Sequence, residues 1–246
     1  MLPRLYISTP IHDQNQIRLD QQAGRYLLRV LRLGPGSAVA LFDNSGHEYA
    51  CTLLDRDNKP TLSIDRISTP NREAPFEITL VHGLTRTSAL EMIIQKGVEL
   101  GVSRFIPLKT QRSTSRPDAK LSANRLQRLH RIAQEAAEQC QRVYVPEILA
   151  PIGWNELDRL LQPGPRLLFW EENQHAHQLK QLTHPDPLTT LTLLTGPEGG
   201  LDAAEVSHAQ QEMDFSIITL GPRILRAETA AITAVSAVLT LWGDLG

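Results

Sequence analysis

The chain has 246 residues, a formal net charge of −2, 41% hydrophobic residues and 21% charged residues. This composition supports one or two packed domains and excludes a largely disordered chain. No apolar run approaches the roughly 18 residues of a membrane-spanning helix, and the first residues lack the apolar stretch of a signal peptide. Two cysteines without metal-ligand spacing fit a reducing compartment. We therefore expect a cytoplasmic protein.

The first 72 residues predict a small barrel of short strands. Only residues 20–31 have the pattern of a helix. Turns rich in Gly, Pro, Asn and Asp separate the expected strands, which lie at 38–42, 47–54 and 61–64. Several short strands in so few residues are typical of a small β-barrel. Two prolines in 69–75 indicate a linker, so the first domain is expected to span 1–72.

Residues 73–246 alternate between predicted strands and predicted helices. The expected strands lie at 77–81, 104–108, 166–170, 190–195 and 216–220. The expected helices lie at 88–100, from 122, from 202 and at 227–242. Asp202 and Glu205 resemble a capping box at the third of these helices. Such alternation predicts a largely parallel sheet, and thus an α/β domain over 73–246.

The last predicted helix lacks a charged face. Residues 230–241 are almost entirely Ala, Ile, Val, Leu and small hydroxyl residues. Such a helix is expected to be buried on all sides. It is either a central core helix or a core helix that also forms a subunit interface, and the sequence leaves both alternatives open.

Basic residues are concentrated in one stretch of the second domain. Within 104–131 a single acid, Asp118, accompanies eight basic side chains: Arg104, Lys109, Arg112, Arg116, Lys120, Arg125, Arg128 and Arg131. This concentration is typical of a polyanion-binding site.

Two turns that contain glycine each follow a predicted strand directly. The first is 195–200 (TGPEGG) and the second is 220–226 (LGPRILR), and a predicted helix follows each. In an open α/β sheet, ligands bind beyond the carboxyl ends of the strands, and glycine lets backbone approach a ligand closely. Together the two turns predict a ligand pocket.

Several common motifs are absent. No GxGxxG follows a predicted strand, no GxxxxGK[ST] is present, and no GxSxG occurs. A Rossmann dinucleotide site, a P-loop and a hydrolase nucleophile elbow are therefore unsupported. His175 and His177 lie among Asn and Gln residues, which indicates a solvated loop, so no metal is expected. A cofactor that is held by backbone and shape fits best.

Segments along nearly the whole chain resemble the RsmE family of SPOUT methyltransferases. They are 3–6 (PRLY), 29–36 (RVLRLGPG), 95–102 (QKGVELGV), 135–142 (EAAEQCQR), 145–148 (VPEI), 196–200 (GPEGG) and 220–230 (LGPRILRAETA). The resemblance implies a PUA-like RNA-binding barrel over 1–72 and a SPOUT α/β domain with a trefoil knot over 73–246. It also implies a homodimer that uses S-adenosylmethionine to methylate N3 of one uridine in 16S rRNA, within the small ribosomal subunit.

The resemblance also implies site residues. The expected cofactor contacts are Trp170, Thr195, Gly196, Gly199, Gly200, Leu220, Gly221, Ile224 and Leu225. Arg226 is the candidate that stabilises the uracil anion. Glu198 and Glu228 either accept the N3 proton or hold the loops together.

The expected RNA contacts are Arg4, Arg86, Arg112, Gln139 and Arg142. Ala89 stands where the family often has a basic residue, and Lys96 with Glu99 fits a surface ion pair. Two other functions remain open: a non-catalytic factor that binds rRNA or assists ribosome assembly, and a SPOUT methyltransferase that acts on another RNA such as tRNA.

Overall fold

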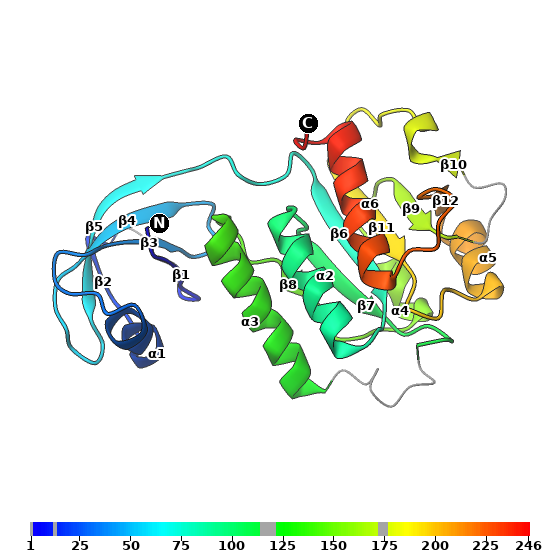
Figure 1. The fold of residues 1–246 in the computed structure, drawn as a ribbon. Helices are drawn as coiled ribbons and strands as arrows, with labels where there is room; N and C mark the ends of the chain where they lie inside the picture. The colour runs from blue at the N-terminus through cyan, green and yellow to red at the C-terminus, as the bar shows by residue number, and fades with distance from the viewer. Residues whose placement is uncertain (1, 12–13, 114–121, 172–176) are drawn as a thin grey trace. The chain divides into compact units, whose positions relative to one another are not determined.

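The computed structural model describes residues 2–11, 14–113, 122–171 and 177–246. The chain forms two compact units, whose elements are labelled in Figure 1. Unit 1 comprises Met1–Glu73 and Ala137–Val145, and unit 2 comprises Ala74–Ala136 and Pro146–Gly246. No helix in the described part of the chain is both long and apolar enough to span a bilayer.

Unit 1 contains a five-stranded sheet that curls around one hydrophobic core (Figure 1). The strand order is β1 (Arg4–Tyr6), β3 (Ala38–Phe42), β4 (Glu48–Leu53), β5 (Thr61–Ser68) and β2 (Gln16–Arg18). β1 runs parallel to β3, and the other neighbours are antiparallel. Alternate residues of β4, namely Tyr49, Cys51 and Leu53, are buried in the core, as expected for a strand with one buried face. The three predicted strands and the barrel-like fold are confirmed.

The helix predicted over 20–31 begins as α1 (Gln21–Arg25) and continues as the π-helical turn η1 (Tyr26–Val30). Asp20 caps its start, because the carboxylate accepts a hydrogen bond of 2.7 Å from the N–H of Ala23. Leu27 from η1 is fully buried in the core of unit 1.

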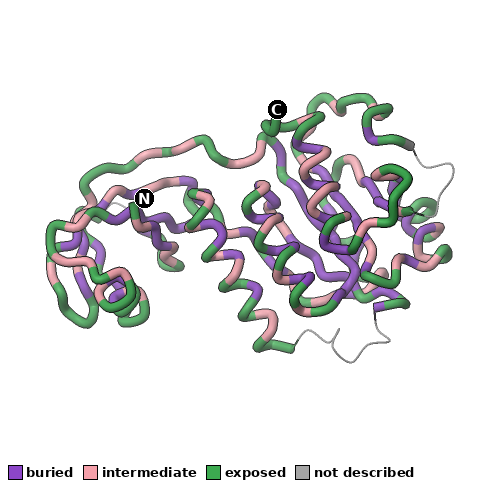
Figure 2. The backbone as a smooth tube through the Cα atoms, viewed as in Figure 1, coloured by how far each residue is buried: buried purple, intermediate pink, exposed green. Residues whose placement is uncertain are grey.

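Unit 2 contains a seven-stranded sheet in which every pair of neighbours is parallel. Its order is β10 (His177–Gln178), β12 (Ser216–Thr219), β9 (Arg166–Phe169), β11 (Thr190–Thr195), β6 (Glu77–Gly83), β7 (Arg104–Leu108) and β8 (Glu147–Ile148). The predicted parallel α/β sheet is confirmed. The central strands β6 and β11 are buried over nearly their whole length (Figure 2).

Helices lie along this sheet. One core cluster joins alternate residues of the strands, such as Val81 and Leu194, to Val206 and Ala209 of α5 (Ala203–Glu212). α2 (Thr87–Glu99) and α6 (Ala227–Trp242) contact each other, and α6 also contacts β11. The remaining helical elements are α3 (Ala123–Cys140), α4 (Trp154–Leu157), η3 (Asp158–Leu160) and η4 (Leu179–Gln181). The predicted capping box is confirmed at α5, where Asp202 is the N-cap and Glu205 completes the box.

The last helix is only partly buried. The buried side of α6 includes Ala231, Ala234, Val235 and Val238. Apart from Leu239, which is also buried, its other positions from 229 to 241 are half-buried or exposed, and Leu241 is 47% exposed. The prediction of burial on all sides is therefore wrong for a single chain, because an apolar outer face remains uncovered.

Candidate functional site

The two glycine turns and the segment after β9 emerge at the same edge of the unit 2 sheet. β9 lies between β11 and β12, and its last residue, Phe169, pairs with Thr195 of β11 and Ile218 of β12. Because the strands are parallel, their carboxyl ends bring Trp170, Gly196 and Leu220 to one edge. The structure thus brings the predicted cofactor residues together from three separate parts of the sequence.

The first turn, 195–200, is held closely by its neighbours. Gly200 has φ of +71°, a conformation that favours glycine, and its N–H donates to the carbonyl of Pro197 at 2.9 Å. At the end of β6, a Cβ atom on Gly83 would lie only 2.7 Å from the backbone nitrogen of Pro197. Arg112 donates from Nη1 to the carbonyl of Gly199 at 2.9 Å. These contacts give the first turn a fixed shape.

The second turn, 220–226, is open to solvent. Gly221 has φ of +107°, and its N–H donates to Thr219 Oγ1 at 3.1 Å. The side chain of Ile224 is 87% exposed, and Leu225 is half-buried. Arg226 is also exposed and forms the N-cap of α6. This turn therefore presents its side chains outward, at the same edge of the sheet as the fixed first turn.

Buried polar atoms without partners mark this edge of the sheet. Among the described residues, Trp170 Nε1, Thr110 Oγ1 and Thr85 Oγ1 are shielded from solvent and lack a hydrogen-bond partner. They follow the carboxyl ends of β9, β7 and β6, respectively. Because nearly all buried polar groups in proteins are paired, these atoms fit a site that receives the polar groups of a ligand.

Arg86 contacts both candidate catalytic glutamates. Its backbone N–H donates to Glu198 Oε1 at 3.1 Å, and its Nε lies 3.6 Å from the same oxygen. Its Nη2 lies 3.7 Å from Glu228 Oε1. The two carboxylates thus share one guanidinium, an arrangement that favours their structural role.

A buried histidine, which the sequence did not single out, lies next to the first turn. His82 in β6 is 3% exposed, and its Nδ1 shares a hydrogen bond of 2.6 Å with Thr195 Oγ1. Burial lowers the pKa of His82 to about 4, although the charge of nearby Glu198 opposes this shift. Nε2 has no hydrogen-bond partner within the described part of the chain. His82 is therefore neutral at physiological pH, and no sequence motif marks it.

Two of the predicted RNA contacts are buried within unit 1. Arg4 forms an ion pair with Glu48 and donates to the carbonyl of Arg142 at 2.8 Å. Burial first, and then the charge of Arg72, lowers the pKa of Arg4 to about 10. Arg142 is 3% exposed and pairs with Glu73 at 2.6 Å. These placements argue against direct RNA contacts by Arg4 and Arg142.

The other candidates are exposed. Arg86, Arg112 and Gln139 are all accessible to solvent. Ala89 is buried in α2, so that position presents no side chain to RNA. The expected surface ion pair of Lys96 and Glu99 is confirmed, with 2.8 Å between Nζ and Oε1.

The basic stretch does not form one surface patch. Arg104 lies at the amino end of β7 and pairs with Glu147, whereas Arg112 follows the carboxyl end of the same strand. Arg116, Asp118 and Lys120 lie outside the described residues. The sequence concentrates these charges, but β7 places two of them at opposite ends of the sheet.

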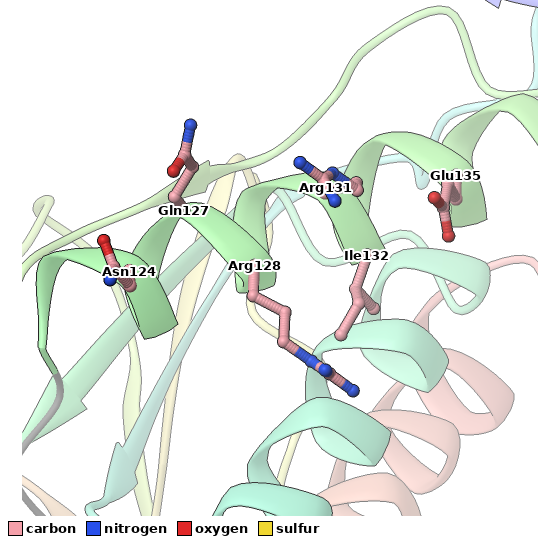
Figure 3. Close-up of a pocket in the computed structure, with 6 residues that line it drawn as sticks. All are labelled: Asn124, Gln127, Arg128, Arg131, Ile132 and Glu135. Atoms are coloured by element: carbon pink, nitrogen blue, oxygen red, sulfur yellow. The ribbon is translucent and has the colours of Figure 1, made fainter. Parts of the chain in front are cut away.

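A groove of about 280 Å³ lies along α3 (Figure 3). Its lining residues are Asn124, Gln127, Arg128, Arg131, Ile132 and Glu135. Arg128 reaches toward α2 and pairs with Glu91 at 2.6 Å. None of these six residues belongs to a glycine turn, so this groove is separate from the candidate cofactor site.

The predicted histidine loop lies largely outside the described residues. His175 lies outside the described residues, and the side chain of His177 is likewise not described. Over the parts of the chain that the structure does describe, no three His, Cys, Asp or Glu side chains gather as metal ligands.

Two family models match the chain. A model described as an RNA methyltransferase domain covers residues 72–239. A model described as an RNA methyltransferase PUA domain covers residues 19–64. The first match alone includes more than half of the chain, together with both glycine turns.

Relatives agree with these models. The ribosomal RNA small subunit methyltransferase E of Bacillus subtilis is 33% identical over 87% of this chain and 85% of that protein. The structure of the enzyme of the same name from Neisseria gonorrhoeae, bound to S-adenosylmethionine, has a TM-score of 0.89 with 31% identity and covers 100% of both chains. A Legionella pneumophila methyltransferase with bound S-adenosylmethionine has a TM-score of 0.89 with 29% identity, again over 100% of both chains. The chain belongs to the ribosomal RNA small subunit methyltransferase E family of RNA methyltransferases.

Proposed function

We propose that this protein transfers a methyl group from S-adenosylmethionine to N3 of one uridine in 16S rRNA, within the small ribosomal subunit in the cytoplasm. The two glycine turns and Trp170, which emerge at the carboxyl edge of a parallel sheet near unpaired buried polar atoms, carry this proposal. Family membership and the bound donor in two related structures support the choice of cofactor.

The donor site that we propose uses backbone groups and shape. Its residues are Trp170, Thr195, Gly196, Gly199, Gly200, Leu220, Gly221, Ile224 and Leu225. When bound, S-adenosylmethionine supplies a methyl group that its positive sulfur activates. Both turns contact the donor, and the open second turn also faces the RNA. Close alignment of the two reacting groups supplies a large part of such catalysis.

Arg226 is the proposed catalytic residue. Uracil N3 attacks the methyl group effectively only after it loses its proton, and the ring then carries negative charge. The exposed guanidinium of Arg226, at the end of the second turn, stabilises this charge. Glu198 and Glu228 hold the loops through Arg86, so the proton passes to solvent rather than to either carboxylate.

The RNA-binding role extends to the amino-terminal part of the chain. We propose a PUA-like RNA-binding domain over 1–72 and a methyltransferase domain over 73–246. The PUA model and the curled sheet support the first of these. Of the predicted RNA contacts we retain the exposed Arg112 and Gln139. Arg86 is exposed as well, but it pairs with Glu198 and Glu228.

The proposal includes a trefoil knot and a homodimer. The resemblance to the SPOUT methyltransferases is what supports the knot. The half-exposed apolar side of α6 supports a homodimer, since a second copy would cover it.

The direct test is a methyl-transfer assay on free 16S rRNA, on assembled small subunits and on tRNA, with mass spectrometry of the nucleosides. We expect one N3-methyluridine in 16S rRNA or in the subunit. No transfer to any of the three RNAs would contradict the proposal. If the RNA affinity changes neither with S-adenosylmethionine nor with Arg226→Ala, the protein is a non-catalytic assembly factor. Methyl transfer to tRNA alone would identify a different target.

A further inference from the structure

We propose that Arg86 is a positioning residue that locks the two glycine turns together through Glu198 and Glu228. This inference rests on the proposed function, because it assumes that the turns bind the methyl donor. It gives Arg86 a role other than the RNA contact that the sequence predicted.

The position of Arg86 follows from the sheet. β6 and β11 are neighbours, with His82 opposite Thr195 in the register. The loop after β6 therefore begins beside the first turn, and Gly83 lies against Pro197 with room only for a hydrogen atom. Arg86 follows three residues later, at the N-cap of α2.

Glu198 connects the first turn to α2. Its carboxylate accepts the N–H of Arg86 at 3.1 Å and lies 3.6 Å from Nε of the same residue. A carboxylate at this place is favourable, because the start of a helix carries unpaired N–H groups and a partial positive charge. The first turn is thereby tied to the start of α2.

Glu228 connects the same guanidinium to the second turn. It lies in the first turn of α6, two residues after Arg226, and its side chain is only 11% exposed. Oε1 lies 3.7 Å from Nη2 of Arg86, while Oε2 has no hydrogen-bond partner among the residues described. A buried carboxylate without a cation is costly, so Arg86 stabilises the start of α6 and the second turn before it.

The side chain of Arg86 is 51% exposed, so solvent weakens each of its ion pairs. Arg86 therefore acts mainly by fixing the positions of the two carboxylates, and less by the strength of its ion pairs. The planar fork of arginine contacts two carboxylates with different nitrogens, which the single amine of lysine does not reproduce. Without this cation the two carboxylates repel each other and the spacing of the turns changes.

The test compares Arg86→Ala and Arg86→Lys with a control, Lys96→Ala, which removes a cation paired to Glu99 near the other end of α2. We expect Arg86→Ala to raise both the Kd and the KM for S-adenosylmethionine roughly tenfold, equivalent to about 1.4 kcal/mol. Arg86→Lys should give an intermediate loss. The KM for RNA and the RNA affinity should stay within about twofold of wild type, and Lys96→Ala should match wild type throughout.

A double-mutant cycle identifies the partner. If Arg86 acts through Glu228, the loss of donor affinity caused by Glu228→Gln should be smaller in the Arg86→Ala background than in wild type. Fully additive losses would overturn the proposal, as would weaker RNA binding by Arg86→Ala with unchanged donor affinity. Thermal unfolding checks each variant, and Arg86→Lys carries the test if Arg86→Ala does not fold. Failure of the wild-type protein to bind the donor would instead refute the proposed function.

Discussion

The two glycine turns of unit 2 are built in opposite ways. In the first turn, a Cβ on Gly199 would lie only 3.1 Å from the Cβ of Arg112, and Pro197 is buried against Gly83. In the second turn, a Cβ on Gly221 would meet nothing within 4 Å, and residues 221–224 are all exposed. The first turn is packed against neighbouring residues, whereas the second is exposed to solvent.

This contrast shows that glycine serves two purposes here. Gly83 is needed because the backbone of Pro197 leaves no space for a side chain. Gly221 is needed because its φ of +107° is unfavourable for other residues, although space is available. Changes at the first turn should therefore affect both folding and donor binding, whereas changes at the second should leave folding intact and affect only donor binding or the reaction.

The largest effect is expected from Gly83→Ala. The added methyl group would clash with the backbone of Pro197, which has no flexible end to move aside. We expect a loss of roughly 3 kcal/mol in the free energy of unfolding, together with loss of donor binding. Urea denaturation and calorimetry would measure both. Gly34→Ala is the control, because nothing lies within 4 Å of its Cβ position. If Gly83→Ala binds the donor with wild-type affinity, the first turn is not rigid.

Arg226→Ala should have the next largest effect, and it should act on catalysis. Because Arg226 is exposed at the N-cap of α6, its loss should leave the free energy of unfolding nearly unchanged. We expect kcat to fall about 100-fold, the effect of removing one group that stabilises developing charge. Single-turnover methyl transfer would measure this. An unchanged kcat would remove Arg226 from the reacting centre, and a large loss of donor affinity would assign it to binding instead.

The third effect is a dependence of stability on pH that His82 causes. Its folded pKa of about 4 lies below the ordinary value of 6.5, so the unfolded chain takes up the proton first as the pH falls. The stabilisation is complete above pH 6.5 and is lost between pH 6.5 and 4. At pH 5.5 this group should reduce the free energy of unfolding by about 1.4 kcal/mol relative to pH 7.5.

His82→Gln provides the comparison for this prediction. All other titratable groups are common to the two proteins, so the difference between their stability curves isolates His82. Denaturant titrations at pH 7.5, 6.5 and 5.5 would measure it. Parallel curves for the two proteins would mean that His82 becomes protonated in the folded state as easily as in the unfolded state.

Local patterns in the sequence predict the long elements but not the short ones. A long apolar run places α6 at its observed bounds, 227–242, and the strand patterns place β3, β7 and β11 equally well. The strands β1, β2, β8 and β10 have only two or three residues, too few for a period to be recognised. The position of β9 between β11 and β12 depends on pairing between distant segments, which no local pattern encodes.

The candidate site shows the same limit. The glycine turns were recognisable because each follows a predicted strand. The burial of Arg4 and Arg142 was not, because their partners Glu48 and Glu73 are distant in sequence. His82 gave no signal at all, since a single histidine at the end of a strand looks like any other residue until Thr195 is placed beside it.

The smallest effect is expected from Ile224→Ser in the open turn. Ile224 is 87% exposed, so its removal should change the free energy of unfolding by less than about 0.5 kcal/mol. If Ile224 covers the bound donor, the Kd for S-adenosylmethionine should rise about threefold, or roughly 0.7 kcal/mol. Met92→Ser, which removes an exposed apolar side chain from α2, is the matched control and should not change this Kd. Unchanged donor affinity with weaker RNA binding would mean that Ile224 contacts the RNA and not the donor.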